Sequence, residues 1–140
     1  MGEFDGRVVF ITGIARGQGR NHAIRFAREG ASIIGVDIAG PVSAYNTYAP
    51  VTEADFHETV QLVEAEGAKI HARIADVRDS ATLQAVVDEG VAQFGRLDVV
   101  VATAGICNWN RFWEMPDEQF EELIDINLTG VFKTLKAATP

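Results

Sequence analysis

Apolar runs alternate with amphipathic segments along this chain, and the alternation predicts strands that alternate with helices. Apolar runs predict strands at residues 7–13, 31–37 and 97–102, the first two of them buried on both faces. Another strand, the third along the chain, is predicted at residues 68–75, where charged positions alternate with apolar ones. Apolar positions three or four residues apart predict a helix after each strand, the later ones at residues 53–66, 80–94 and 117–139.

Residues with strong positional preferences mark the ends of two of these helices. Ser80 is expected to cap the helix at 80–94, and Gly95 is expected to end it. Pro116 is expected in the first turn of the last helix, where proline is well tolerated. Residues 38–52 carry no charge and contain two prolines, which predicts a long loop after the second strand.

This order of elements predicts a doubly wound α/β fold, in which helices cover both faces of a parallel sheet. A sheet of four strands leaves an apolar edge that proteins usually cover. We therefore expect residues 1–140 to be part of a single domain and to supply the first four strands of a larger sheet. Either a partner completes that sheet or further sequence does.

Composition narrows the classes of partner. The chain has 12 Lys and Arg against 20 Asp and Glu, a formal charge of −8, so no basic surface is expected for nucleic acid or an anionic membrane. Neither a signal peptide nor a membrane-spanning run is visible. The single cysteine, Cys107, excludes an intrachain disulfide and is typical of a reducing compartment, so a cytoplasmic location is expected.

A glycine-rich turn follows the first predicted strand and opens the first predicted helix. Gly13, Gly17 and Gly19 allow a tight turn and a close approach of the backbone, while Arg16 and Gln18 lie between them. Free N–H groups at the start of a helix attract a negatively charged group. The turn therefore predicts a pyrophosphate-binding site of the Rossmann type, although three glycines alone also suit a purely structural turn.

The cofactor preference depends on the end of the second strand. Asp37 can accept hydrogen bonds from both hydroxyls of an adenosine ribose and would repel a 2′-phosphate. Ile38 stands where a basic residue would be needed to pair with that phosphate. Arg16 would favour NADP if its guanidinium reached a 2′-phosphate. A solvated or diphosphate-facing position is the better interpretation of this residue. NAD is therefore expected in preference to NADP.

Together these features resemble the first half of the short-chain dehydrogenase/reductase family, over residues 6–140. Four motifs in register carry the resemblance: Thr-Gly-x-x-x-Gly-x-Gly at 12–19, Asp76-Val77 after the third strand, Ala104-Gly105 after the fourth, and Asn127 in the last helix. The resemblance implies that Asp76 and Val77 flank the adenine and that Ala104 and Gly105 form a close-packed wall of the cofactor site. It further implies a catalytic role for Asn127, through a water that links a lysine to solvent.

A subgroup is suggested by residues 13–23 and by the long loop at 38–52. Both resemble the mycofactocin-associated, carveol-dehydrogenase-like members of the family. That likeness implies an NAD-dependent oxidoreductase that interconverts a secondary alcohol and a ketone. It also implies tightly bound NAD, with mycofactocin as the electron acceptor.

Two departures from the family pattern qualify this expectation. The family has Asn-Asn where this chain has Ala102-Thr103, and Thr103 keeps only one hydroxyl for the lost amides. The resemblance implies that the family's catalytic Ser, Tyr and Lys lie beyond residue 140, so the domain is expected to be truncated before them. Neither Tyr45 nor Tyr48 has a lysine four residues later to replace the pair. The chain alone is therefore expected to be inactive. The alternative is a dinucleotide-binding half-domain or interaction fragment without catalysis, and a methyltransferase fits the later motifs less well.

The last predicted helix carries two apolar stripes. Phe120, Ile124 and Val131 share a face with Asn127, whose amide is expected to be buried and hydrogen-bonded to water or backbone. The second stripe consists of Leu128, Phe132 and Leu135. A helix that is apolar on two sides packs twice, so residues 117–139 are expected either to join a dimer or tetramer interface or to be covered by missing sequence.

Two further sets of residues bear on a possible metal site and a possible substrate pocket. The three histidines are too dispersed for a local metal site, and no metal is expected. Trp109, Phe112 and Trp113 follow the fourth strand, where they would either line an apolar substrate pocket or pack within the fold.

Overall fold

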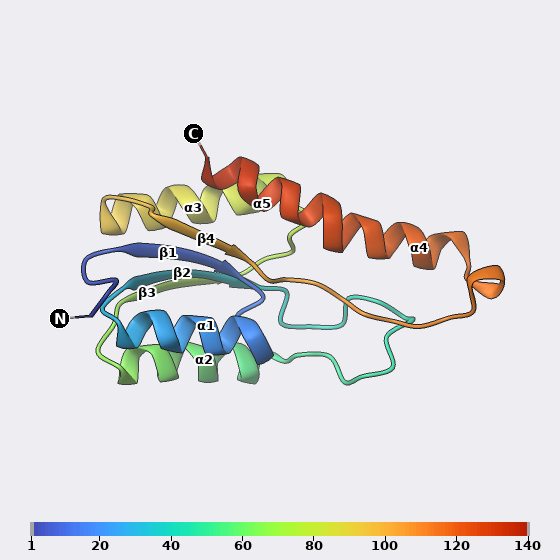
Figure 1. Cartoon of the computed structure of the whole chain (residues 1–140), viewed down its shortest axis with the longest axis horizontal. Coiled ribbons are helices and arrows are strands. Elements are labelled where there is room, and N and C mark those ends of the chain that lie inside the picture. The colour runs from blue at the N-terminus through green and yellow to red at the C-terminus, as the bar shows by residue number, and fades with distance from the viewer. Residues whose placement is uncertain (1, 140) are drawn as a thin grey trace.

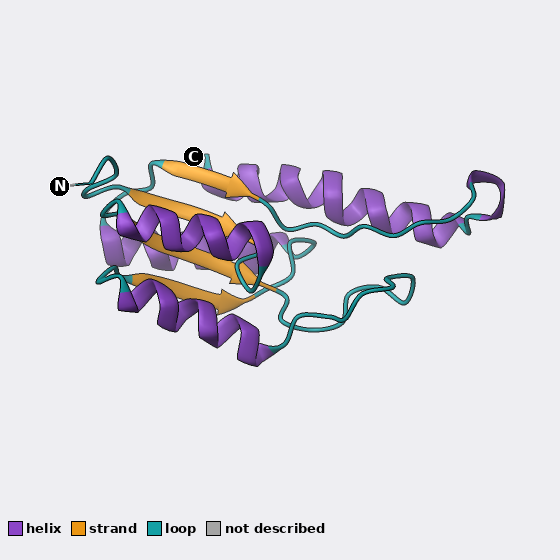
Figure 2. Cartoon of the chain, turned by 60° about the horizontal axis from the view of Figure 1, so that its bottom comes forward, coloured by secondary structure: helices purple, strands orange, loops and turns teal. Residues whose placement is uncertain are grey.

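The computed structural model describes residues 2–139, which form a four-stranded sheet with helices on both faces (Figures 1 and 2). The first half of the chain contains β1 (Val8–Thr12), α1 (Gly17–Arg28), β2 (Ser32–Asp37) and α2 (Glu53–Ala65). The second half contains β3 (Ile70–Ile74), α3 (Ser80–Phe94), β4 (Val99–Ala102), α4 (Asp117–Ile124) and α5 (Gly130–Ala138). Among residues 2–139 no helix is long and apolar enough to cross a membrane.

All strand pairs are parallel, in the order β3-β2-β1-β4. Figure 1 shows α1 and α2 on one face of the sheet and α3 and α5 on the other. The chain therefore runs outward from β1 through β2 to β3, then crosses back to place β4 on the other side of β1. The predicted doubly wound α/β fold is confirmed.

The core has two halves, because successive side chains of a strand point to opposite faces of the sheet. Phe10 and Ile34 are fully buried beneath α3 and α5, in one cluster with Leu83 of α3. Ile11 and Ile33 are fully buried on the opposite face, beneath α1 and α2. β1 and β2 are thus buried on both sides, which explains why both read as continuous apolar runs.

One predicted cap is wrong. The N-cap of α3 is Asp79, whose carboxylate accepts hydrogen bonds from the N–H groups of Ala81 and Thr82. Ser80 is the first residue of the helix instead. Serine and aspartate both favour the N-cap position, and in this helix Asp79 occupies it. Gly95 ends α3 in the left-handed conformation, at φ +83°, as predicted.

The last predicted helix is interrupted. A π-helical turn, η2 (Asp125–Thr129), separates α4 from α5, and Pro116 lies at the N-cap of α4, one position before the predicted one. A π turn holds more residues than an α turn, so it rotates every later position around the axis. This rotation upsets the predicted faces, which assume one continuous α-helical period.

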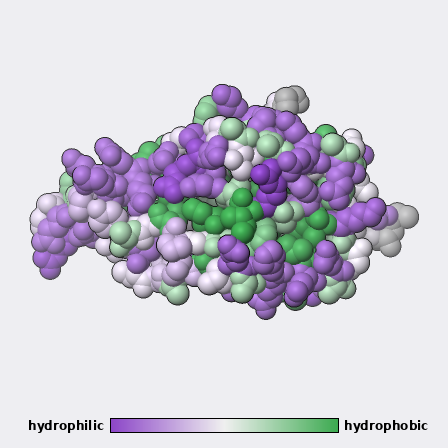
Figure 3. Space-filling model, turned by 180° about the vertical axis from the view of Figure 1, so that it is seen from behind, coloured by the Kyte–Doolittle hydropathy of each residue, from purple (hydrophilic) through white to green (hydrophobic). Residues whose placement is uncertain are grey.

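The face of α4 and α5 that packs on the sheet is therefore not the predicted one. The buried positions of α4, η2 and α5 are Gln119, Ile126, Gly130, Thr134 and Ala137, whereas Asn127 is exposed. The large apolar residues form an outer ridge along α4 and α5, all exposed in the described chain: Phe120, Ile124, Leu128, Phe132 and Leu135. Apolar surface is also prominent when the molecule is seen from behind, where it gathers in a band along the middle between polar borders (Figure 3).

Two long loops leave the carboxyl ends of the strands: residues 38–52 after β2, as predicted, and residues 103–116 after β4. The second loop contains one short 3-10 turn, η1 (Phe112–Glu114). Figures 1 and 2 show both loops extending beyond the sheet at the same end of the molecule. Ligands of open parallel sheets bind at this edge, next to the point where the strand order reverses.

Candidate functional site

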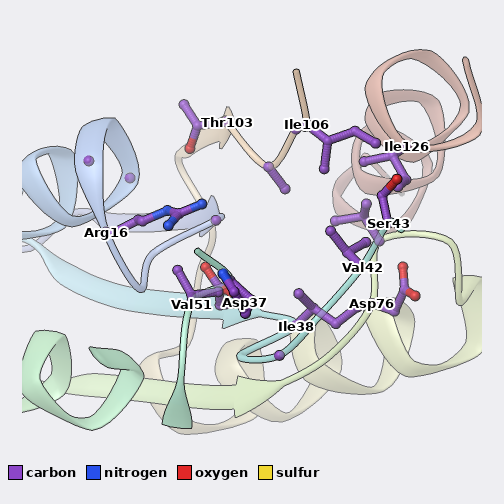
Figure 4. Close-up of a pocket in the computed structure, with 18 of the residues that line it drawn as sticks. Arg16, Asp37, Ile38, Val42, Ser43, Val51, Asp76, Thr103, Ile106 and Ile126 are labelled. Carbon is purple, nitrogen blue, oxygen red and sulfur yellow. The ribbon is translucent and has the colours of Figure 1, made fainter. Parts of the chain in front are cut away.

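A cleft of about 540 Å³ opens at the carboxyl edge of the sheet, between the glycine turn after β1 and the loops after β2, β3 and β4 (Figure 4). Small-molecule sites typically enclose about 300–1,000 Å³. All the residues expected to contact a cofactor line this cleft: Gly13, Arg16, Gly17, Gln18, Gly19, Asp37, Ile38, Asp76, Val77, Thr103, Ala104 and Gly105. Asn127 lies behind the lining, against Ile106.

The glycine turn has the geometry of an anion cradle. Gly13 and Gly17 have φ values of +77° and +58°, which other residues rarely adopt. A Cβ on Gly19 would lie 1.9 Å from the carbonyl oxygen of Gly13, so the start of α1 approaches the turn too closely for any side chain. No side chain caps α1, and its first N–H groups are left for an outside acceptor. These features fit a pyrophosphate.

Asp37 is held rigidly at the end of β2. It is 8% exposed, and its Oδ2 accepts a hydrogen bond from the N–H of Ala15 at 2.9 Å. Its Oδ1 accepts one from the N–H of Ala39 at 3.0 Å, and Ala39 adopts a φ of +49° that is unusual for alanine. Each carboxylate oxygen retains a second lone pair, so the group can still accept hydrogen bonds from ligand hydroxyls.

The two residues that bear on cofactor choice occupy different positions. Ile38 lines the cleft directly after Asp37 and adds no positive charge there. Arg16 extends from the start of α1 over the cleft (Figure 4), where its Nη1 donates a hydrogen bond to the carbonyl oxygen of Ala49. The guanidinium is therefore attached to the loop at 38–52 instead of standing free in solvent.

Asp76 and Val77 lie in the turn after β3. Both oxygens of Asp76 accept hydrogen bonds from the Arg78 guanidinium, at 2.6–3.0 Å. Burial raises the pKa of Asp76, but the hydrogen bonds and charge of Arg78 outweigh it and hold the pKa below its usual value. Val77 is buried, and a Cβ on Gly130 would lie 2.7 Å from its Cγ2, so α5 fixes this turn. Sequence reasoning overlooked Arg78, although a basic residue two positions after an acid was a visible signal.

The end of β4 is bonded to the end of β1 despite the missing asparagines. The Thr103 hydroxyl donates to the carbonyl oxygen of Thr12 at 2.5 Å, and the N–H of Ala104 donates to the Thr12 hydroxyl at 3.1 Å. A Cβ on Gly13 would lie 2.9 Å from the backbone of Ala104. The two threonines thus join the strands, and the wall at Ala104 is tightly packed.

Asn127 occupies the π turn and pairs with the backbone of a single residue. Its Oδ1 accepts a hydrogen bond from the N–H of Ile106, and its Nδ2 donates one to the carbonyl oxygen of Ile106, each at 2.8 Å. A Cβ on Gly105 would lie 3.1 Å from the same Oδ1. The expectation of a bond to backbone is met, and the expectation of burial is wrong, since the residue is exposed.

Sequence reasoning also missed a polar network that joins the two long loops to α4. Gln119 is fully buried, donates to the Oδ1 of Asn108 at 2.6 Å, and accepts from Asn110 at 3.2 Å. Asn108 in turn donates to Asn46, and Ser43 donates to Glu122. The density of amide side chains at residues 108, 110 and 119 was the available signal.

Two candidate sets lie outside the cleft. Trp109, Phe112 and Trp113 are strongly exposed, so within the described chain they neither line the cleft nor pack in the core. Among residues 2–139, no three His, Cys, Asp or Glu side chains come together as they would to hold a metal.

Comparison with known proteins gives this geometry its context. The chain is 56% identical, over 99% of its length, to an uncharacterised NAD-dependent oxidoreductase of Mycobacterium tuberculosis. It is 45% identical, over its whole length, to a (−)-trans-carveol dehydrogenase of Rhodococcus erythropolis. The chain spans about half the length of these curated relatives, since it covers 50% of each.

Two solved structures are similar to this chain in both fold and sequence. A short chain dehydrogenase of Mycobacterium paratuberculosis bound to NAD superposes with a TM-score of 0.98 at 49% identity, covering 99% of this chain and 51% of that one. A carveol dehydrogenase of Mycobacterium avium in complex with NAD gives 0.96 at 46% identity, covering 100% and 50%. The family model for the short chain dehydrogenases matches residues 7–140. The chain therefore belongs to the short-chain dehydrogenase family.

Proposed function

We propose that the chain forms the cofactor-binding part of an NAD-dependent oxidoreductase that interconverts a secondary alcohol and a ketone. The observation that carries the proposal is the placement of Asp37 beside the uncapped start of α1, within one cleft at the reversal of strand order. A carboxylate next to an anion cradle suits a dinucleotide with free ribose hydroxyls. Two relatives of nearly the same fold have been crystallised with NAD.

Each part of the cleft has a role in this proposal. The N–H groups at Gly17, Gln18 and Gly19 bind the pyrophosphate, and Asp37 accepts hydrogen bonds from the adenosine ribose. Asp76 and Val77 flank the adenine. Thr103, Ala104 and Gly105 form the opposite wall, which Asn127 supports through Ile106. The chemistry that NAD supplies when bound is acceptance of a hydride from the alcohol carbon.

The exposed position of Asn127 supports its proposed place in a proton relay. Its side chain lies in the π turn, is exposed and is bonded to Ile106 in the wall of the cleft. A water bound beside this amide would pass a proton between solvent and the site. The similarity to carveol dehydrogenases supports a secondary alcohol as substrate. Mycofactocin as the electron acceptor is proposed on the resemblance of residues 13–23 and of the loop at 38–52 to the mycofactocin-associated members of the family.

We also propose that the protein is a homo-oligomer, either dimer or tetramer, and that it is cytoplasmic. The outer ridge supports the first proposal, because an exposed apolar stripe of this length usually marks an interface. The single unpaired cysteine supports the second.

The test is to titrate the complete gene product with NAD and NADP by calorimetry, and then to supply carveol with NAD and follow the absorbance of reduced nicotinamide. Tighter binding of NAD and alcohol-dependent reduction are expected. Binding without reduction by any secondary alcohol would favour the non-catalytic alternative. Failure to bind either dinucleotide would refute the proposal.

A further inference from the structure

Arg16 is the only positively charged residue among the described residues that line the cleft. The same lining contains two carboxylates, Asp37 and Asp76. Arg16 follows Ala15, whose N–H binds the Oδ2 of Asp37 at 2.9 Å, so the arginine backbone lies next to the acid proposed to hold the ribose. An arginine near that ribose is what a site for NADP requires, because it pairs with the 2′-phosphate.

The guanidinium of Arg16 is occupied by the loop at 38–52. Its Nη1 donates to the carbonyl oxygen of Ala49 at 2.7 Å, and its Cζ lies 5.1 Å from the centre of the Tyr48 ring. That distance is typical of a cation–π contact. Two consecutive residues of the loop thus hold the one cation that lines the cleft.

Tyr48 is itself held from the far side of the cleft. Its hydroxyl oxygen accepts a hydrogen bond from the N–H of Cys107, in the loop after β4, at 3.2 Å. The ring therefore has a fixed position between Arg16 and Cys107. It connects the glycine turn, the loop at 38–52 and the loop after β4, and its place does not depend on Arg16 alone.

From this geometry we infer that Tyr48 is a specificity-determining residue: it holds the Arg16 guanidinium on the loop at 38–52, away from the place where a 2′-phosphate would need it. The inference rests on the proposed function. Asp37 disfavours NADP by repulsion, and Tyr48 disfavours it by withholding the one available cation. A cation–π contact at an exposed site shifts an equilibrium by about 2- to 5-fold.

A different role for Arg16 makes a different prediction. If the guanidinium serves the pyrophosphate, which NAD and NADP share, then releasing it changes both affinities by the same factor. If Tyr48 acts on the 2′-phosphate through Arg16, then its removal changes the affinity for NADP alone. The ratio of the two dissociation constants therefore separates the two roles.

The experiment measures the dissociation constants of NAD and NADP by calorimetry in the complete gene product. Tyr48→Ala is expected to lower the NADP constant about 2- to 5-fold relative to the NAD constant. Tyr48→Phe is the matched control: it keeps the ring over Arg16 and loses only the bond from Cys107, so it is expected to leave the ratio within about 2-fold of the original. Both variants are also made with Asp37→Asn, which removes the repelling charge and strengthens NADP binding to a measurable range.

Arg16→Ala supplies the decisive comparison. Adding it to Tyr48→Ala is expected to abolish the gain in NADP affinity. The inference is overturned if Tyr48→Ala leaves the ratio unchanged, if it strengthens NAD and NADP equally, or if the gain survives the loss of Arg16. If the protein binds NAD but Tyr48→Ala produces no selective gain in NADP affinity, this inference is overturned and the proposed function stands. If the protein binds neither dinucleotide, both are overturned.

Discussion

The side-chain amide of Asn127 forms two hydrogen bonds with the backbone of Ile106: it donates to the carbonyl oxygen and accepts from the N–H, each at 2.8 Å. The pairing crosses from the π turn to the loop after β4. Ile106 is buried and lines the cleft, so the loop that forms one wall of the site is held by a side chain outside it.

Replacing Asn127 by leucine should destabilise the fold as well as the site. The buried N–H and C=O of Ile106 would lose their partner, and an unpaired buried backbone group costs about 1–3 kcal/mol. We expect the free energy of unfolding in urea to fall by an amount of this order. Glu121→Ala, an exposed change on α4, is the control and should have little effect. Equal stability of the Asn127→Leu variant would show that the pairing contributes nothing.

Asp37→Ala should weaken the binding of NAD and narrow its advantage over NADP. Hydrogen bonds to a charged group contribute about 1.5–3 kcal/mol, so the affinity for NAD should fall by about 10- to 100-fold. Asp37→Asn separates charge from shape, because an amide oxygen can still accept from the N–H of Ala15. Calorimetric titration of both variants checks this, and an unchanged preference for NAD would remove Asp37 from the site.

The sequence was sufficient to predict the parts of the site that depend on short stretches of chain. The glycine turn and Asp37 each stand at a strand end, and strand ends are visible as the limits of apolar runs. Parallel pairing of β1 with β2 and β4 then brings the ends together, whatever the details of packing. The cleft lining follows from this topology.

Contacts that depend on the path of a loop could not be predicted. Arg16 binds Ala49, and Tyr48 binds Cys107, pairs that are 33 and 59 positions apart. Nothing in the periodicity of residues 38–52 indicates which side chains meet the glycine turn. The exposure of Asn127 was missed for another reason: Asn127 lies within the π turn, whose residues do not follow the predicted pattern of 3.6 residues per turn.

Stability should decline in acid through Asp98, at the start of the segment leading into β4. Hydrogen bonds from Arg96, with further ones from Val8 and Arg7, hold the pKa of Asp98 well below its usual value. A lowered pKa in the folded state stabilises the fold above the unfolded value of about 3.9, and that contribution disappears as the pH falls below it. Asp98→Asn should therefore lower the free energy of unfolding at neutral pH.

The same comparison in acid tests the cause. The difference in unfolding free energy between Asp98→Asn and the unsubstituted protein should shrink below about pH 4, because the carboxyl of the latter then binds a proton in the unfolded state, which favours unfolding. Glu121→Gln, which removes an exposed carboxyl on α4, should show no such convergence. A difference that stays constant over this range would mean that the charge of Asp98 does not stabilise the fold.

A negative charge on the outer ridge should dissociate the proposed oligomer without unfolding its subunits. Leu128 and Phe132 are 63% and 61% exposed in the described chain, so Leu128→Glu or Phe132→Glu removes little packing within it. In a packed interface, the same glutamate would have to be buried without a partner, which is strongly unfavourable. We expect light scattering of the complete gene product to report a smaller mass for either variant, with the circular dichroism spectrum of the folded protein retained. Lys136→Glu, an exposed charge reversal on α5, should keep the original mass. If both ridge variants keep the original mass, the ridge is not the interface, and its apolar residues must be covered by other sequence.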